Sequence, residues 1–171
     1  MLDDLERWAA GARAQEAAEE RIRERWLRQA AEEEASFSGL LVDLAEDGGP
    51  VSVTTTAGRR HHGPIAAVGT DFVAVGGPDG RLVLVAIGAV AEVRPAAGGR
   101  HPPAATTGRP PLGVTLAEVL AQAVATRPRL AVVAGAVTVV GQLRAVGIDV
   151  LTVRTDGEPP GQSYVTLASV S

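Results

Sequence analysis

Apolar side chains recur at spacings of three and four residues over the first 47 positions, which predicts a long amphipathic helix. The positions that follow this spacing, apolar and polar together, are Leu5, Trp8, Ala12, Gln15, Glu19, Ile22, Trp26, Gln29, Glu33, Phe37, Leu40 and Leu44. Several of them are polar, which argues against a continuous coiled coil. Ser36 is suited to cap a new helix, so we expect a break near Ser36 to Ser38 and an end at Gly48-Gly49-Pro50.

After this break the pattern changes to short apolar segments that are separated by turn residues, which predicts strands. The first five segments cover residues 51–56, 59–68, 71–75, 82–87 and 89–93. Five short strands with tight turns are typical of a small barrel or sandwich. A stretch rich in Pro and Gly follows, then a helix over 112–126 that Thr115 is placed to cap, then strands from Leu130 onward.

The second group of segments repeats the first. Residues 63–75 align with residues 141–153, and six of the 13 aligned positions are identical. The match extends to the flanks, where Val51, Val53 and Gly58 pair with Leu130, Val132 and Gly135. Because a helix precedes both copies, duplication is favoured over a chance likeness of two Val-rich segments. The aligned Asp71 and Asp149 follow Gly at predicted turns, where Asp bonds its own backbone, so we expect structural roles for both.

Composition and charge narrow the class of protein. The chain has no Cys, and an acidic start at Met1–Asp4 is unlike a signal peptide, so we expect a cytoplasmic protein. The longest apolar runs are too short to span a membrane. Residues 1–47 carry a net charge of −7, residues 48–97 of +1 and residues 98–171 of +2. This distribution lacks the dense basic stripe of a dedicated nucleic-acid binder.

The densest polar cluster is Arg59-Arg60-His61-His62. Adjacent residues of a strand point to opposite faces, and the chain has only one other His, His101, so a shared metal ion is disfavoured. An exposed basic hairpin is the favoured interpretation, with an anion or nucleic-acid contact as the alternative. The sequence has no phosphate loop, nucleophile elbow or dinucleotide fingerprint. We therefore expect no enzyme, no cofactor and no small-molecule substrate.

A helix followed by five short strands resembles the Sm-like fold of the Sm and Sm-like proteins and of bacterial Hfq. The resemblance covers residues 37–95 and again 112–171. In the first copy the matching residues are Val51, Val53, Gly58, Gly63, Ile65, the strand 71–73 and the segment 85–90. The resemblance implies small barrels that assemble by pairing their edge strands with those of neighbouring barrels.

The chain departs from this family at the residues that contact RNA. The family pattern has an acid six positions after the second Gly and an Asn ten positions after it. Gly69 and Val73 occupy these positions in the first copy, and Gly147 and Leu151 occupy them in the second. The later basic pair would fall within residues 86–88, where no residue is basic. The resemblance therefore implies a barrel without the family's RNA pocket.

The predicted fold class is mainly β with helices (α+β), as two Sm-like small barrels in tandem behind a long charged helix. We expect a charged helix over 1–35, a first barrel with its helix over 36–95, a linker over 96–111 and a second barrel with its helix over 112–171. The second copy stops at Ser171, before any counterpart of Val93, so a last strand is either clipped or supplied by the N-terminal region.

The leading hypothesis is a non-enzymatic assembly or protein-interaction module that oligomerises through barrel edges and the N-terminal helix. Trp8, Ile22 and Trp26 lie on one stripe of that helix, and they either pack on the protein's own body or form a partner-binding seam. The alternative function is RNA or DNA binding through the cationic residues of the two barrels. The residues assigned to it are Arg59, Arg60, His61, Arg81 and Arg144.

Overall fold

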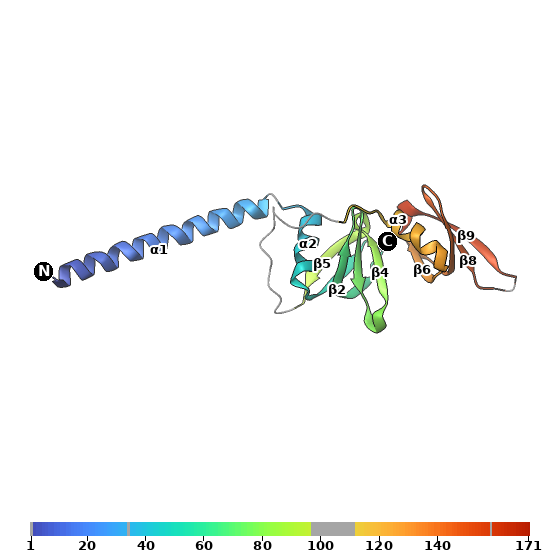
Figure 1. Cartoon of the computed structure of the whole chain (residues 1–171), viewed down its shortest axis with the longest axis horizontal. Helices are drawn as coiled ribbons and strands as arrows, with labels where there is room; N and C mark the ends of the chain where they lie inside the picture. Colours follow the sequence, from blue (N-terminus) through green and yellow to red (C-terminus); the bar gives the residue numbers. More distant parts are fainter. Residues whose placement is uncertain (1, 34, 97–111, 158) are drawn as a thin grey trace.

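The computed structural model describes residues 2–33, 35–96, 112–157 and 159–171, which form an α+β structure with two antiparallel sheets. The helices are α1 (Leu2–Glu33), α2 (Phe37–Asp47) and α3 (Leu116–Ala123). The first sheet contains β1 (Pro50–Thr55), β2 (Arg60–Val68), β3 (Phe72–Gly76), β4 (Leu82–Ala86) and β5 (Val90–Pro95). The second contains β6 (Arg129–Ala134), β7 (Val137–Val146), β8 (Val150–Thr155) and β9 (Gly161–Thr166). Figure 1 shows α1 extending away from both sheets.

The predicted break between the first two helices is confirmed. Ser36 has an extended backbone, and its side chain accepts a hydrogen bond of 3.0 Å from the N–H of Gly39. This bond satisfies one of the free amides at the start of α2. Gly48 ends α2 with a left-handed backbone at φ 68°, a conformation that glycine adopts without a steric penalty.

The strands of the first sheet lie in the order β4-β3-β2-β1-β5, with every neighbouring pair antiparallel. After β4 a short 3-10 helix, η2 (Ile87–Ala89), carries the chain to the opposite edge, where β5 pairs with β1. The expectation of a closed barrel is not met in the described residues, because the consecutive strands β4 and β5 lie at opposite edges and do not pair with each other. Both are therefore outer strands.

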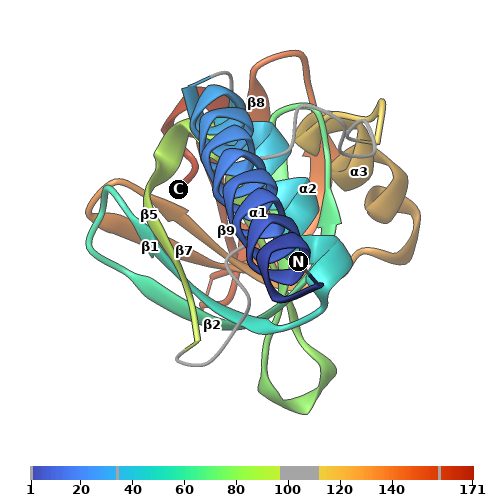
Figure 2. The same ribbon diagram turned by 90° about the vertical axis from the view of Figure 1, so that its left-hand side faces the viewer.

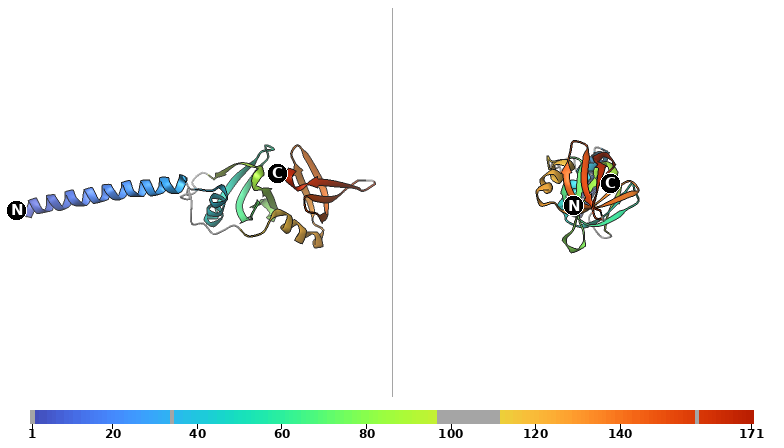
Figure 3. Two further views of the ribbon diagram at one scale, coloured as in Figure 1. Left: turned by 90° about the horizontal axis from the view of Figure 1, so that it is seen from above. Right: turned by 90° about the vertical axis from the view of Figure 1, so that its right-hand side faces the viewer.

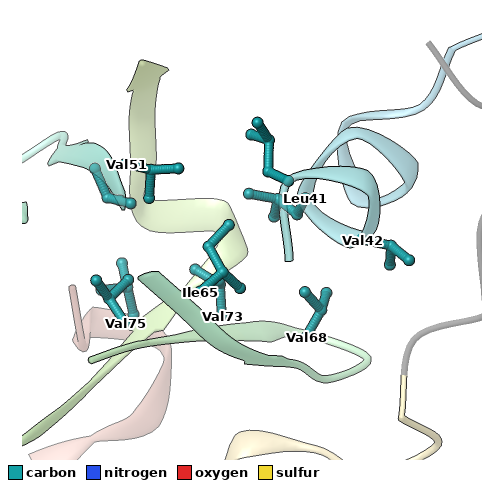
Figure 4. Packing of buried hydrophobic residues seen from close by; sticks show 10 residues of the cluster. Leu41, Val42, Val51, Ile65, Val68, Val73 and Val75 are labelled. Carbon is teal, nitrogen blue, oxygen red and sulfur yellow. The ribbon is translucent and has the colours of Figure 1, made fainter. Parts of the chain in front are cut away.

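The main hydrophobic core lies between α2 and one face of the first sheet. Leu41 of α2 is fully buried against the inward-facing valines of the strands, as Figure 4 shows. The buried members of this core are Leu41, Val42, Leu44, Val51, Val53, Ile65, Val68, Val73, Val75 and Val85. Nearly all are Val or Leu, which fits the low aromatic content of the chain. Burial of these side chains is what holds α2 on the sheet.

The second sheet has the order β6-β7-β8-β9 and its own smaller core under α3. The sequence predicts five strands here, but the described residues form four. At the place of the fifth strand, Val170 makes a single antiparallel bridge with Ala134. This bridge corresponds to the pairing of Val90 with Thr55 at the start of β5 in the first sheet.

The residues aligned by the internal repeat occupy matching places in the two sheets. The β2–β3 ladder has an irregularity between Ile65 and Ala67, and the β7–β8 ladder has one between Leu143 and Ala145. The backbone carbonyl of Asp71 accepts from Ile87 N–H at 2.8 Å, and that of Asp149 accepts from Leu167 N–H at 2.8 Å. The repeat in the sequence is therefore also a repeat of backbone geometry.

Helix α3 packs on two sheets at once. One side lies on the core of the second sheet, and the other lies on the outer face of β3 and β4 in the first sheet. Leu116, Phe72 and Ala74 are buried at this contact. Figures 1 and 3 show α1, the first sheet and the second sheet following one another along the long axis. Figure 2, viewed from the α1 end, shows α2 behind α1.

Candidate functional site

The structure does not bring the five predicted nucleic-acid contacts together. Arg59 lies at the β1–β2 turn, and its Nη2 donates a hydrogen bond of 2.7 Å to Thr138 Oγ1 of β7. Arg81 is exposed in the β3–β4 connection, and Arg144 is half-buried on β7 of the other sheet. Arg60 and His61 are neighbours on β2 and therefore point to opposite faces. The five residues thus belong to two sheets and to both faces of the first.

His61 belongs to the inner face of the first sheet. It pairs with Val53, which is fully buried, and cross-strand partners share a face. Its position in the second sheet is taken by Val139, which pairs with Val132 in the same way. Burial lowers the pKa of His61 from its ordinary value of 6.5, and the positive charge of Arg59 and the proximity of His62 lower it further. The lowered pKa disfavours the cationic form of His61.

The outer face of the same strands carries a different set of polar side chains. In the β2–β1–β5 ladders Ser52 pairs with both His62 and Arg94, so these three residues form one row. Thr54 pairs with both Arg60 and Glu92, which form the next row. The hydroxyl oxygen of Thr54 is buried and has no hydrogen-bond partner among the described residues. The two rows place two arginines and a histidine on one side of the sheet.

These rows border an open depression of about 340 Å³. Its lining residues are Pro50, Val51, Ser52, Arg60, His62, Glu92, Arg94, Pro95 and Ala96. Glu92 Oε1 lies 2.6 Å from Arg94 Nη2, and both side chains are largely exposed. Within the described part of the chain, the side chains of Arg60 and His62 form no hydrogen bond or salt bridge. We call this feature the β1 depression.

Sequence reasoning on the basic cluster missed His62 and Arg94 as companions of Arg60. The alternation of β2 was the available signal for His62, because it stands two positions from Arg60. The position of Arg94 depends on the pairing of β5 with β1, a contact between segments about 40 residues apart. No local pattern in the sequence specifies that register.

The stripe on α1 is open to solvent where the structure describes it. Ile22 is 50% exposed and Trp26, one turn further on, is 67% exposed. Neither packs on the protein's own body, so that interpretation is wrong for these two residues. Trp8 belongs to α1, but its side chain lies outside the described residues, as do His101 and nearly all of the predicted linker.

Asp71 has a structural role, but its partner differs from the expected one. Its carboxylate oxygen Oδ1 accepts a hydrogen bond of 2.7 Å from the N–H of Leu116, the first residue of α3. The predicted cap of this helix is confirmed, because Thr115 Oγ1 accepts from Glu118 N–H and Glu118 accepts in return from Thr115 N–H. The hydrogen bonds that the Glu118 carboxylate accepts from the backbone N–H and from the hydroxyl of Thr115 lower the pKa of Glu118. The start of α3 is thus held both by Asp71, which precedes β3 of the first sheet, and by its own capping residues.

Comparisons with protein-family models, with curated proteins and with solved structures found no match to this chain. None of the helices in the described residues combines the length and the apolar character that crossing a membrane requires. Among the described residues no three His, Cys, Asp or Glu side chains gather where they could hold a metal ion.

Proposed function

We propose that the protein is a non-enzymatic assembly module that binds a second copy of itself through α1. The observation that carries the proposal is the exposure of Ile22 and Trp26, one turn apart on a helix that extends away from the sheets. Large apolar side chains on a projecting helix lose contact with water only when another surface covers them. Leu27 is also 65% exposed, about 100° around the helix from Trp26.

The charges of α1 favour a second copy as the occupant. Residues 13–33 contain five Arg and six Glu, and both signs alternate along the helix. Two such helices can lie side by side without strong repulsion, and their opposite charges can pair across the seam. Because most helical stability in proteins comes from packing of an apolar face, pairing would also stabilise α1 itself.

Each sheet with its helix is further proposed to be an Sm-like unit. The strand order β4-β3-β2-β1-β5 behind α2, and the matching order in the second sheet, support this assignment. Outer strands present unpaired backbone groups that another chain can pair with. On β4 the side chain of Leu82 is 57% exposed, which makes this edge a second contact surface in the proposed assembly.

The test is the mass of the full chain in solution, measured by light scattering across a range of concentrations. We expect a dimer or larger species, and we expect the double substitution Ile22→Ala with Trp26→Ala to lower its mass. Glu24→Ala is the matched control, because Glu24 is exposed on the opposite side of the same helix. A monomeric wild-type protein, or a double variant with an unchanged mass, would refute the proposal.

A further inference from the structure

The β1 depression places donors around a single hydroxyl. Ser52 lies between His62 and Arg94 on the two neighbouring strands, and Arg60 stands two positions before His62 on the same face. Neighbouring strands are about 4.8 Å apart, so the Cα atoms of His62 and Arg94 flank Ser52 at a total span of roughly 10 Å. Long arginine side chains from the two sides can therefore meet over Ser52.

We propose that the β1 depression binds a phosphate group, with Arg60, His62 and Arg94 as its donors. A guanidinium presents several N–H groups in a planar fork that matches the oxygens of phosphate. Ser52, which lines the depression, supplies a hydroxyl, and an imidazole N–H of His62 supplies another donor. The proposal does not depend on self-association, because all of these residues lie on one sheet.

The remaining lining fits the body of a phosphorylated molecule. Pro50 and Pro95 also line the depression, so it contains apolar atoms that an apolar part of the ligand can contact. Glu92 is the one acid of the lining, and its Oε1 accepts a hydrogen bond of 2.6 Å from Arg94 Nη2. The cationic side chains still outnumber it, so the local field favours an anion.

A phosphate group occurs both in small molecules and in nucleic-acid backbones. A titration of the protein with several probes, followed by NMR, distinguishes these two kinds of ligand. The probes are inorganic phosphate, adenosine monophosphate, adenosine and a single-stranded RNA oligomer. We expect phosphate and adenosine monophosphate to shift the amide signals of β1, β2 and β5, while adenosine leaves them unchanged. Tighter binding of the oligomer than of the mononucleotide would identify a nucleic-acid backbone as the source, and the reverse order would identify a small molecule.

Substitutions within the depression test the assigned donors. Arg60→Ala and Arg94→Ala should each weaken binding of adenosine monophosphate by about tenfold, since each removes a charge-assisted hydrogen bond. Arg81→Ala is the matched control, because Arg81 is an exposed arginine of the first sheet region that does not line the depression. The variant Ile22→Ala with Trp26→Ala should bind as the wild type does. Absence of binding by every phosphate probe, or equal losses in Arg60→Ala and Arg81→Ala, would overturn the proposal.

Discussion

The carboxylate of Asp71 in the first sheet region accepts a hydrogen bond of 2.7 Å from the backbone N–H of Leu116 at the start of α3. This N–H is one of the helix-terminal amides that have no partner within the helix. The negative charge also lies at the positive end of the helix dipole. A single side chain therefore joins the first sheet to the helix that covers the second.

Replacing Asp71 tests this connection. We expect Asp71→Ala to lower the free energy of unfolding by about 1–2 kcal/mol, the usual cost of a lost capping bond beside a buried residue. Urea unfolding of the full chain would measure the change. The matched control is Asp149→Ala at the aligned position, which should cost less than about 0.5 kcal/mol because its exposed side chain makes no such bond. Equal losses in the two variants would contradict the assigned role.

The sequence does not predict the contact of α3 with the first sheet. Patterns in the sequence predict the strand segments, the caps at Ser36 and Thr115, and the repeat. All of these are present in the structure. The burial of Phe72 and Ala74 on the outer face of β3 depends on a helix about 40 residues further along the chain. The continuous apolar run of β3 is typical of a strand that is covered on both faces, but it does not specify what covers it.

In the candidate site, too, local patterns predict some features, while others depend on contacts between distant segments of the chain. Alternation along β2 predicts that His61 and His62 point to opposite faces, and the ladder confirms this. The grouping of Arg60 with His61 as one contact surface conflicts with that alternation. Arg94 enters the site only through the β1–β5 pairing.

Replacing Gly63 tests the close contact between the backbones of β2 and β3. A Cβ atom at this position would overlap the carbonyl oxygen of Gly76, which belongs to the neighbouring strand β3. We expect Gly63→Ala to destabilise the protein by about 3 kcal/mol, because the strands must separate to admit the methyl group. Thermal unfolding followed by circular dichroism would measure this.

Gly88→Ala is the control for Gly63→Ala. A Cβ at Gly88 meets no atom within 4 Å, so we expect a change within about 0.5 kcal/mol. A melting temperature of Gly63→Ala that matches that of Gly88→Ala would show that β2 and β3 are not in close contact at this position.

Replacing Glu92 tests whether the ligand of the β1 depression is negatively charged. Its carboxylate would repel a phosphate bound beside Arg94, while its exposed ion pair with that arginine contributes at most about 1 kcal/mol to positioning. We therefore expect Glu92→Gln to tighten the binding of adenosine monophosphate by about two- to threefold, as removal of one like charge near the ligand requires. The same NMR titration measures this, and weaker binding would contradict an anionic ligand.

His61 links stability to pH. Burial, with the charge of Arg59 and the proximity of His62, lowers its pKa in the folded state below the ordinary 6.5. The unfolded chain therefore takes up a proton first as the pH falls. The contribution of His61 to stability is complete above pH 6.5 and is lost progressively as the pH falls through the lowered folded pKa. We expect the melting temperature of the wild type to fall between pH 7.5 and pH 5.5.

His61→Val should reduce this fall in melting temperature. Valine is the residue at the matching position of the second sheet, Val139, so the side chain suits an inward-facing site of this fold. His62→Gln is the control, because His62 lies on the outer face and is the smallest of the three causes of the lowered pKa, so its replacement should leave most of the dependence on pH in place. If His61→Val loses as many degrees between pH 7.5 and pH 5.5 as the wild type and His62→Gln do, the inner face of β2 is not the source of the acid sensitivity.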